Sequence, residues 1–384
     1  MQGRRLRLGL LSGWPWDIAR GSGTARFLID IERALLREGT DLVRIDSDLD
    51  PADYRSFVAR RLEWNRTLWT DPRLERLDAV LALDYDGVDL PPPPAGPVKI
   101  VCPQAVFANL AGTEPEPFRG SLLVQADAEG RNVRSARAVI VPSRYAADGV
   151  ARSYGIARDR IVVIPHGFDN DEWSAMVADA AERRAEADSF VPVSRDGSLR
   201  TILAVAKLYP RKGIDLLLEA AAILKRSRGD LRVRIVGGGI DAERLHRVSS
   251  ELDISDMVRF EGDIEDRRSV AKCYAEADLF CLPSRHETFG FAFVEAMAAG
   301  LPVVALDAGA APDVVGDAGI LVPPGDPIAL AGAIAEILDN PLTAQGLRQK
   351  GRARAAGYDW PATARRYLQV VRGAIQSRQG KVVL

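Results

Sequence analysis

The sequence predicts an α/β protein with two domains, each built on a parallel β-sheet that helices cover. Short apolar runs alternate with helical patterns, which is typical of parallel sheets. One series of runs ends near residue 164 and a second starts after residue 199. The chain of 384 residues also exceeds the size at which one hydrophobic core usually keeps growing.

Each half contains short apolar runs that predict strands. The runs of the first half are residues 7–11, 42–45, 79–83, 98–101, 138–141 and 161–164. The runs of the second half are residues 201–206, 233–236, 258–260, 279–282, 303–306 and 320–322. No run approaches the roughly 18 apolar residues that a membrane-spanning helix needs. We therefore expect a cytoplasmic protein.

The segments outside these runs complete the domain prediction. Residues 181–198 are charged and then contain Pro, Gly and Ser with little core pattern, which indicates a linker or surface insertion. Pro361 marks the first turn of a final helix. We predict a first domain over residues 1–180, the linker over 181–198, a second domain over 199–358, and a helix over 359–384 that packs back on the first domain.

The composition argues against several kinds of partner. A formal net charge of −2 provides no overall field that would recruit nucleic acid. Cys102, Cys273 and Cys281 lack any Cys-x-x-Cys pairing, so neither a disulfide framework nor a zinc site is predicted. The acidic residues at 46–48, 84–86 and 263–265 are interpreted as loop and cap acids, and we expect no metal site.

Residues 279–304 predict a strand, a polar loop, a short helix and another strand. In parallel sheets, ligands bind beyond the carboxyl ends of the strands, where the loop 283–290 is expected. Thr288 is a plausible N-cap, which would aim the amides of Phe289, Gly290 and Phe291 at a phosphate. The alternative is an ordinary helix cap without a ligand.

Glu295 is the only charged residue between Phe291 and Ala299, on a helix that is apolar nearly all round and is therefore expected to be buried. A buried carboxylate needs hydrogen-bond donors, and the hydroxyls of a ribose would supply them. Glu287 and Glu295 also suggest the paired carboxylates of a glycoside hydrolase. Eight residues of helix advance about 12 Å, beyond the roughly 5–9.5 Å of such pairs, which weakens that alternative without excluding it.

Two lysines and a glycine run in the second half are further candidates. Lys207 and Lys212 follow a strand and would neutralise a departing diphosphate, although each alone is more typical of a solvated surface lysine. Gly237 and Gly238 follow another strand without the third glycine of a dinucleotide fingerprint. We interpret them as allowing close approach to a nucleotide.

Together these residues make the chain resemble family 4 of the retaining glycosyltransferases, which have the GT-B fold of two Rossmann-like domains facing across a cleft. The signature is the pair Glu287 and Glu295 in the segment HETFGFAFVEAMAAGLPVVA. Supporting segments are KLYPRKG, RIVGGG and IVVIPHGFD. Nearly the whole chain takes part in the resemblance.

The resemblance implies a role for each candidate residue. Glu287 would contact hydroxyls of the donor sugar and Glu295 would hold the ribose. The amides of Thr288, Phe289 and Gly290 would approach the phosphates. Lys212 matches the family's lysine, and Lys207 stands where the family usually has an arginine; both would stabilise the departing diphosphate.

In the first half, Gly23 is the best match to the glycine-rich loop with which the family meets the donor phosphates, and a tight turn is the alternative interpretation. Many members place a histidine near the donor sugar after the strand at 98–101. This chain has Gln104 there, which is a candidate contact to the sugar or acceptor. His166 stands where the family commonly has asparagine and is a second candidate contact.

The resemblance implies a hexosyltransferase that uses a UDP- or GDP-sugar as co-substrate, with no other cofactor. The acceptor would be a glycan, a lipid-linked molecule or a small molecule. Arginines and two tryptophans between Arg55 and Arg76 allow peripheral contact with the inner face of the membrane, or a solvated helix with its tryptophans turned to the core. Alternatives are a nucleotide-sugar-binding protein without transferase activity, or a phosphorylase or epimerase.

Overall fold

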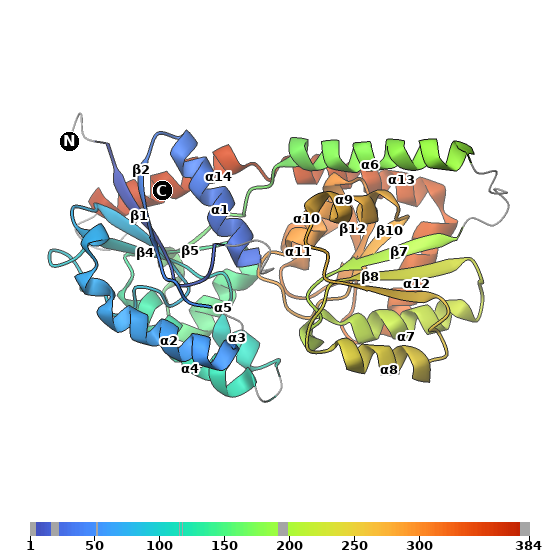
Figure 1. Ribbon diagram of the computed structural model, residues 1–384, viewed down its shortest axis with the longest axis horizontal. Coiled ribbons are helices and arrows are strands. Elements are labelled where there is room, and N and C mark those ends of the chain that lie inside the picture. Colours follow the sequence, from blue (N-terminus) through green and yellow to red (C-terminus); the bar gives the residue numbers. More distant parts are fainter. Residues whose placement is uncertain are drawn as a thin grey trace. The chain divides into compact units, whose positions relative to one another are not determined.

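The computed structural model describes residues 5–16, 23–50, 53–114, 116, 118–190 and 199–376. The chain forms two compact units, one of residues 1–167 with 359–384 and one of residues 168–358. Each unit contains a six-stranded parallel sheet with helices on both faces (Figure 1). Each predicted run forms a strand, with ends that differ by at most two residues from the prediction.

The sheet of the first unit has the order β2-β1-β3-β4-β5-β6. Its strands are β1 (Arg7–Ser12), β2 (Asp41–Asp46), β3 (Ala79–Leu83), β4 (Val98–Cys102), β5 (Ala138–Val141) and β6 (Ile161–Val163). Every residue of β3 and β5 is buried, as expected for strands covered on both faces. The order reverses between β1 and β3, which makes the carboxyl ends of these strands the switch point of the sheet.

Helices cover both faces of this sheet. They are α1 (Gly23–Arg37), α2 (Tyr54–Thr67), α3 (Phe107–Ala111), α4 (Phe118–Ser135), α5 (Arg144–Tyr154) and α14 (Trp360–Gln376). Helices α1 and α14 lie together on one face, and α2 to α5 lie on the other (Figure 1). The C-terminal helix α14 is fixed to this unit because Thr363 Oγ1 donates to the Pro165 carbonyl oxygen at 3.1 Å and Trp360 contacts the ring of Phe27.

The second unit has the strand order β12-β11-β10-β7-β8-β9, which is the order of Rossmann-type sheets. Its strands are β7 (Arg200–Val205), β8 (Leu231–Val236), β9 (Val258–Gly262), β10 (Leu279–Leu282), β11 (Val303–Leu306) and β12 (Gly319–Val322). The switch point of this sheet lies between β7 and β10, which are hydrogen-bonded neighbours although β8 and β9 separate them in the sequence.

The helices of the second unit again form two layers. They are α6 (Asn170–Phe190), α7 (Ile214–Lys225), α8 (Ala242–Glu251), α9 (Arg267–Ala275), α10 (Phe291–Ala298), α11 (Ala311–Val314), α12 (Pro327–Asp339) and α13 (Pro341–Ala356). Helices α7, α8 and α12 cover one face, and α6, α9, α10 and α13 cover the other (Figure 1). A 3₁₀ turn, η5 (Pro210–Lys212), precedes α7.

The boundary between the units differs from the predicted one. Residues 168–180 were assigned to the first domain, but α6 begins at Asn170 and belongs to the second unit. The Asn170 amide donates to the carbonyl oxygen of Ala355 at 2.8 Å, which ties the start of α6 to that unit. Residues 181–190 of the predicted linker continue α6, and residues 191–198 lie outside the described residues. The contacts of α6 with α9 and α13 place this helix in the second unit. The amino-acid composition of the segment does not indicate these contacts.

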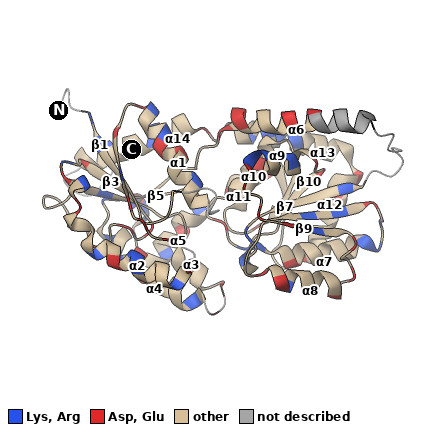
Figure 2. Ribbon diagram, in the orientation of Figure 1, with Lys and Arg blue, Asp and Glu red and all other residues tan. Residues whose placement is uncertain are grey.

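Basic and acidic residues are interspersed along the helices of each unit (Figure 2). No helix in the described ranges is long and apolar enough to cross a lipid bilayer. Within the same ranges, no group of three or more His, Cys, Asp or Glu side chains is arranged to hold a metal ion.

Candidate functional site

The switch point of the second sheet brings together two connections that carry predicted site residues. The connection after β7 contains Lys207 and Lys212, and the connection after β10 contains Glu287 and leads into α10 with Glu295. Because ligands of open α/β sheets bind at such a switch point, the topology favours these two loops as a binding site.

The central contact is an ion pair between Glu287 and Lys212. Lys212 Nζ lies 2.5 Å from Glu287 Oε1, and the two side chains are only 15% and 12% exposed. Burial alone would raise the pKa of Glu287, but the neighbouring Lys212 ammonium group outweighs it and lowers that pKa below the ordinary value. The Glu287 carboxylate is therefore ionised at neutral pH and able to accept hydrogen bonds.

Hydrogen bonds to backbone carbonyl oxygens hold the two connections together. The Arg285 amide donates to the Arg211 carbonyl oxygen at 2.7 Å, and the Arg285 guanidinium donates to the Pro210 carbonyl oxygen at 2.8 Å. The Ala310 amide donates to the Glu287 carbonyl oxygen at 2.9 Å. Glu287 is thus fixed on a polar loop that is bonded to η5 on one side and to the segment after β11 on the other.

The start of α10 corrects one sequence prediction. The N-cap is Gly290, not Thr288. Gly290 has a φ of 90°, a conformation that residues with a Cβ adopt only with strain. The loop therefore turns into the helix two residues later than predicted, because the left-handed turn requires glycine. Phe289 is buried beside this turn.

Glu295 lies on the first turns of α10 and is half-buried. Its Oε2 accepts a hydrogen bond from the hydroxyl of Tyr274 at 3.0 Å. Its backbone carbonyl oxygen accepts from the indole Nε1 of Trp173 on α6 at 2.9 Å. The sequence predicts that this carboxylate needs hydrogen-bond donors, and Tyr274 of the protein itself supplies one of them.

Lys207 forms an ion pair with Asp263, one of the acidic residues that the sequence analysis interprets as loop and cap acids. Lys207 Nζ lies 2.9 Å from Asp263 Oδ1, and the same oxygen accepts from the Gly238 amide at 2.8 Å. Burial would raise the Asp263 pKa, but these two donors lower it. Lys207 and the Gly238 amide therefore converge on one carboxylate oxygen, that of Asp263.

The glycine run after β8 has a structural reason that the sequence interpretation missed. A Cβ at Gly237 would lie 1.9 Å from the Ala206 carbonyl oxygen, and one at Gly239 would lie 2.3 Å from that of Leu208. The backbone that approaches these glycines is thus the protein's own connection after β7. Close approach to a nucleotide is not needed to explain them.

The candidates of the first half lie in the other unit. Gly23 is the first residue of α1, and the rest of the glycine-rich loop before it lies outside the described residues. Gln104 follows β4, where its backbone N–H donates to Asp84 Oδ1 at 2.7 Å. The side chain of His166 is 3% exposed, with its ring 4.6 Å from that of Phe27. Burial lowers the His166 pKa to about 3, so a core role explains this residue.

A buried charged network at the β1–β3 switch point escaped the sequence analysis. Arg61 Nε and Nη2 donate to the Asp86 carboxylate at 2.8 and 2.6 Å, and neither side chain is exposed. Asp86 also accepts from the Gly13 amide at 2.7 Å. Arg61 lies within the run of arginines for which the sequence allows either membrane contact or a solvated helix. The signal that could have indicated its partner is the spacing of Asp84 and Asp86 after a buried strand.

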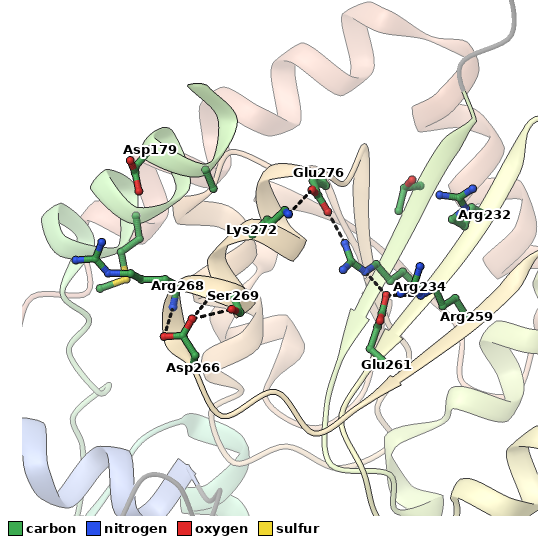
Figure 3. A pocket seen from close by; sticks show the side chains of 13 residues that line it. Asp179, Arg232, Arg234, Arg259, Glu261, Asp266, Arg268, Ser269, Lys272 and Glu276 are labelled. Carbon is green, nitrogen blue, oxygen red and sulfur yellow. Dashed lines mark hydrogen bonds and ion pairs between the residues drawn. The ribbon is translucent and has the colours of Figure 1, made fainter. Parts of the chain in front are cut away.

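A hollow of about 820 Å³ lies in the second unit between α6, α9 and the strands β8 and β9 (Figure 3). None of the predicted site residues lines it. Its charged groups pair with one another: Arg234 contacts Glu261 and Glu276 at 2.6 Å each, and Arg259 lies 2.9 Å from Glu261 (Figure 3). This hollow is therefore lined by polar side chains of β8, β9 and α9, and it is not the predicted site.

Known proteins resemble both halves of the chain. Residues 187–354 match the family described as Glycosyl transferases group 1, and residues 113–172 match Glycosyltransferase Family 4. The GDP-mannose-dependent alpha-(1-6)-phosphatidylinositol monomannoside mannosyltransferase of Mycolicibacterium smegmatis is 30% identical over 300 residues, which are 74% of this chain and 76% of that protein.

A second relative is the D-inositol 3-phosphate glycosyltransferase of Kineococcus radiotolerans, which is 33% identical over 244 residues, 59% of this chain. The match spans about half, 54%, of the length of that relative.

Solved structures share the fold at lower identity. Sucrose-phosphate synthase from Thermosynechococcus elongatus gives a TM-score of 0.77 at 22% identity, covering 96% of this chain and 98% of that one. HepE from Anabaena, in complex with UDP and glucose, gives 0.67 at 19% identity, covering 96% and 100%. These likenesses confirm the predicted GT-B fold class.

Proposed function

The chain belongs to glycosyltransferase family 4, the group 1 glycosyl transferases, and we propose that it transfers a hexosyl group from a UDP- or GDP-sugar to a hydroxyl of an acceptor. The observation that carries the proposal is the buried Glu287–Lys212 pair at the β7–β10 switch point. Glu295 and Lys207 stand on the same two connections.

Each side chain has a distinct role in the proposal. Glu287, ionised beside Lys212, accepts hydrogen bonds from hydroxyls of the donor sugar. Glu295 receives the ribose hydroxyls. Lys212 and Lys207 lie against the diphosphate, where two ammonium groups stabilise the negative charge that develops as the bond to the sugar breaks. The amides of Thr288, Phe289 and Gly290 approach the phosphates from the loop that leads into α10.

The reaction then needs no protein nucleophile. The bond between the anomeric carbon and the phosphate oxygen breaks, and the acceptor hydroxyl oxygen bonds to that carbon on the same face, so the configuration is retained. The acceptor's proton passes to an oxygen of the departing diphosphate. Because lysines supply the positive charge, we expect transfer to be unchanged by a chelator that removes divalent metal ions.

The proposed acceptor group is a hydroxyl of a glycan, a lipid-linked molecule or a small molecule. Relatives named for inositol phosphate and phosphatidylinositol monomannoside acceptors support an anionic acceptor. Peripheral membrane contact at α2 is supported by the exposed Arg55, Arg60 and Arg66 and, in the 3₁₀ turn after this helix, by Trp69, which is 63% exposed. Trp64 packs on the core. If the protein does not float with anionic vesicles, the membrane contact is wrong.

A thermal-shift panel of UDP, GDP, ADP and their sugars tests the donor site. A ligand at 100 times its dissociation constant stabilises the folded state by about 2.7 kcal/mol, so the preferred nucleotide is visible without knowledge of the acceptor. We expect UDP or GDP to raise the unfolding temperature and ADP to do so less. No stabilisation by any nucleotide diphosphate contradicts the proposal.

A further inference from the structure

Glu295 is held by two aromatic residues that the proposed function does not use. The Tyr274 hydroxyl donates to Oε2 of the Glu295 carboxylate at 3.0 Å. A carboxylate has about four acceptor positions on its two oxygens, and this bond occupies one of them. Tyr274 therefore fixes the orientation of the Glu295 carboxylate.

The tyrosine hydroxyl has a fixed position because its ring is locked by neighbours. Tyr274 is 1% exposed and stacks on Phe280 with ring centroids 5.7 Å apart and an interplanar angle of 17°. The ring of Trp173 meets it edge to face at 5.3 Å and 80°. Burial, and then the adjacent Glu295 carboxylate, raise the pKa of Tyr274 well above its ordinary value, so the hydroxyl stays protonated and donates.

The backbone at Glu295 is fixed as well. Trp173 is fully buried, and its Nε1 donates to the Glu295 carbonyl oxygen at 2.9 Å. The same oxygen accepts the helical hydrogen bond from the Ala299 amide at 2.9 Å. Arg267 lies over the Trp173 ring at 5.2 Å, which closes the outer side of this indole. Helix α6 thus anchors α10 at the residue that carries the carboxylate.

We propose that Tyr274 is a positioning residue that fixes the Glu295 carboxylate for two neighbouring hydroxyls of the donor ribose, and that Trp173 fixes the helix beneath it. This inference rests on the proposed function, because it takes the ribose as the ligand of Glu295. A carboxylate held in one rotamer accepts both hydroxyls without an ordering cost, whereas a free one must be ordered on binding. Removing the tyrosine hydroxyl should therefore weaken ribose recognition selectively.

The test compares Tyr274→Phe with the wild-type protein in binding titrations of UDP and GDP and of their 2′-deoxy and 3′-deoxy forms. A hydrogen bond to a charged group is worth enough that losing one hydroxyl should weaken wild-type binding about 10- to 100-fold. The deoxy ratio is the dissociation constant of a deoxy form divided by that of its parent nucleotide. In Tyr274→Phe this ratio should fall at least about threefold, because the parent nucleotide loses two oriented hydrogen bonds and each deoxy form loses one. An unchanged ratio overturns the inference.

Tyr154→Phe is the matched control. Tyr154 also donates its hydroxyl to a buried carboxylate, that of Glu129, but in the first unit. This variant removes a comparable bond and should lower the unfolding temperature while leaving the deoxy ratio at its wild-type value. If it lowers the ratio as much as Tyr274→Phe does, the effect is general loosening and the inference is wrong.

Two further variants separate the possible failures. Should Tyr274→Phe not fold, Trp173→Phe loses only the indole donor and should reduce the deoxy ratio at least about threefold; an unchanged ratio counts against the inference. In Glu295→Ala the discrimination should vanish. If it persists there, or if neither nucleotide binds the wild type, the proposed function fails; if it depends on Glu295 but not on Tyr274, only this inference fails.

Discussion

Replacing Lys212 with methionine removes a positive charge, keeps most of the side chain and isolates the Glu287 carboxylate. The two side chains are 15% and 12% exposed and lie 2.5 Å apart. Removing one partner of a fully buried ion pair costs about 3–5 kcal/mol, because the other charge is left uncompensated. Since both groups keep some solvent contact, we expect Lys212→Met to lose about 2–4 kcal/mol of unfolding free energy at pH 7.

The pH dependence identifies the cause of this loss. In the wild type, Lys212 holds the Glu287 pKa below its ordinary value of 4.5, so the pair stabilises the fold above that pH and the contribution is lost as pH falls through the lowered pKa. In Lys212→Met, burial dominates and raises the Glu287 pKa. Protonation then relieves the buried charge, so the gap to the wild type should narrow as pH falls from 7 to 5.

Urea unfolding at pH 7 and pH 5 measures both effects. Lys225→Met is the matched control, since Lys225 lies 2.7 Å from Asp256 in a solvent-exposed pair of the same unit. The control should change stability little at either pH. The reasoning is refuted if Lys212→Met costs no more than the control, or if its cost is the same at both pH values.

Three further changes have defined outcomes. Lys207→Ala should leave the urea midpoint unchanged, because its pair with Asp263 is exposed, but should raise the donor KM about tenfold through loss of a phosphate contact; an unchanged KM counts against the assigned role. Arg61→Met should destabilise the first unit by about 3–5 kcal/mol in urea unfolding, because it strands the fully buried Asp86; a loss below about 1 kcal/mol would be inconsistent with this. The imidazole of His166, with a pKa of about 3, should show no titration by NMR between pH 5 and pH 8, and a transition near pH 6.5 would show that it is not buried.

The strands and the site loops were accessible from the sequence for a physical reason. Strands buried on both faces must be apolar throughout, so runs such as Ala79–Leu83 predict them. Three charged residues stand out in the sequence because each interrupts a compact or apolar segment that follows such a strand. They are Glu287, Lys212 and Glu295. Glu287 and Lys212 meet at the switch point because of the order of the strands, which the sequence does not state.

Other features depend on contacts between distant segments. The sequence around Arg61 is similar to that around the exposed arginines of the same helix. Only the fold brings Asp86 into contact with Arg61. Tyr274 meets Glu295 from the end of α9, and Trp173 reaches the same residue from α6, which the sequence placed in the other domain. The N-cap is Gly290 and not the predicted Thr288, because the turn needs a positive φ. A capping pattern in the sequence does not indicate this backbone angle.

The central claim is that the Glu287–Lys212 pair lies in a working donor-sugar site. Radiolabelled UDP- and GDP-sugars incubated with the protein and candidate acceptors test it directly, with transferred label and anomeric configuration as readouts. Glu287→Gln should lower the rate about 10²- to 10³-fold, the cost of losing one charged contact in a reacting site, while the exposed Glu243→Gln in α8 keeps the wild-type rate. Full turnover in Glu287→Gln, or inversion of the sugar, would contradict the account.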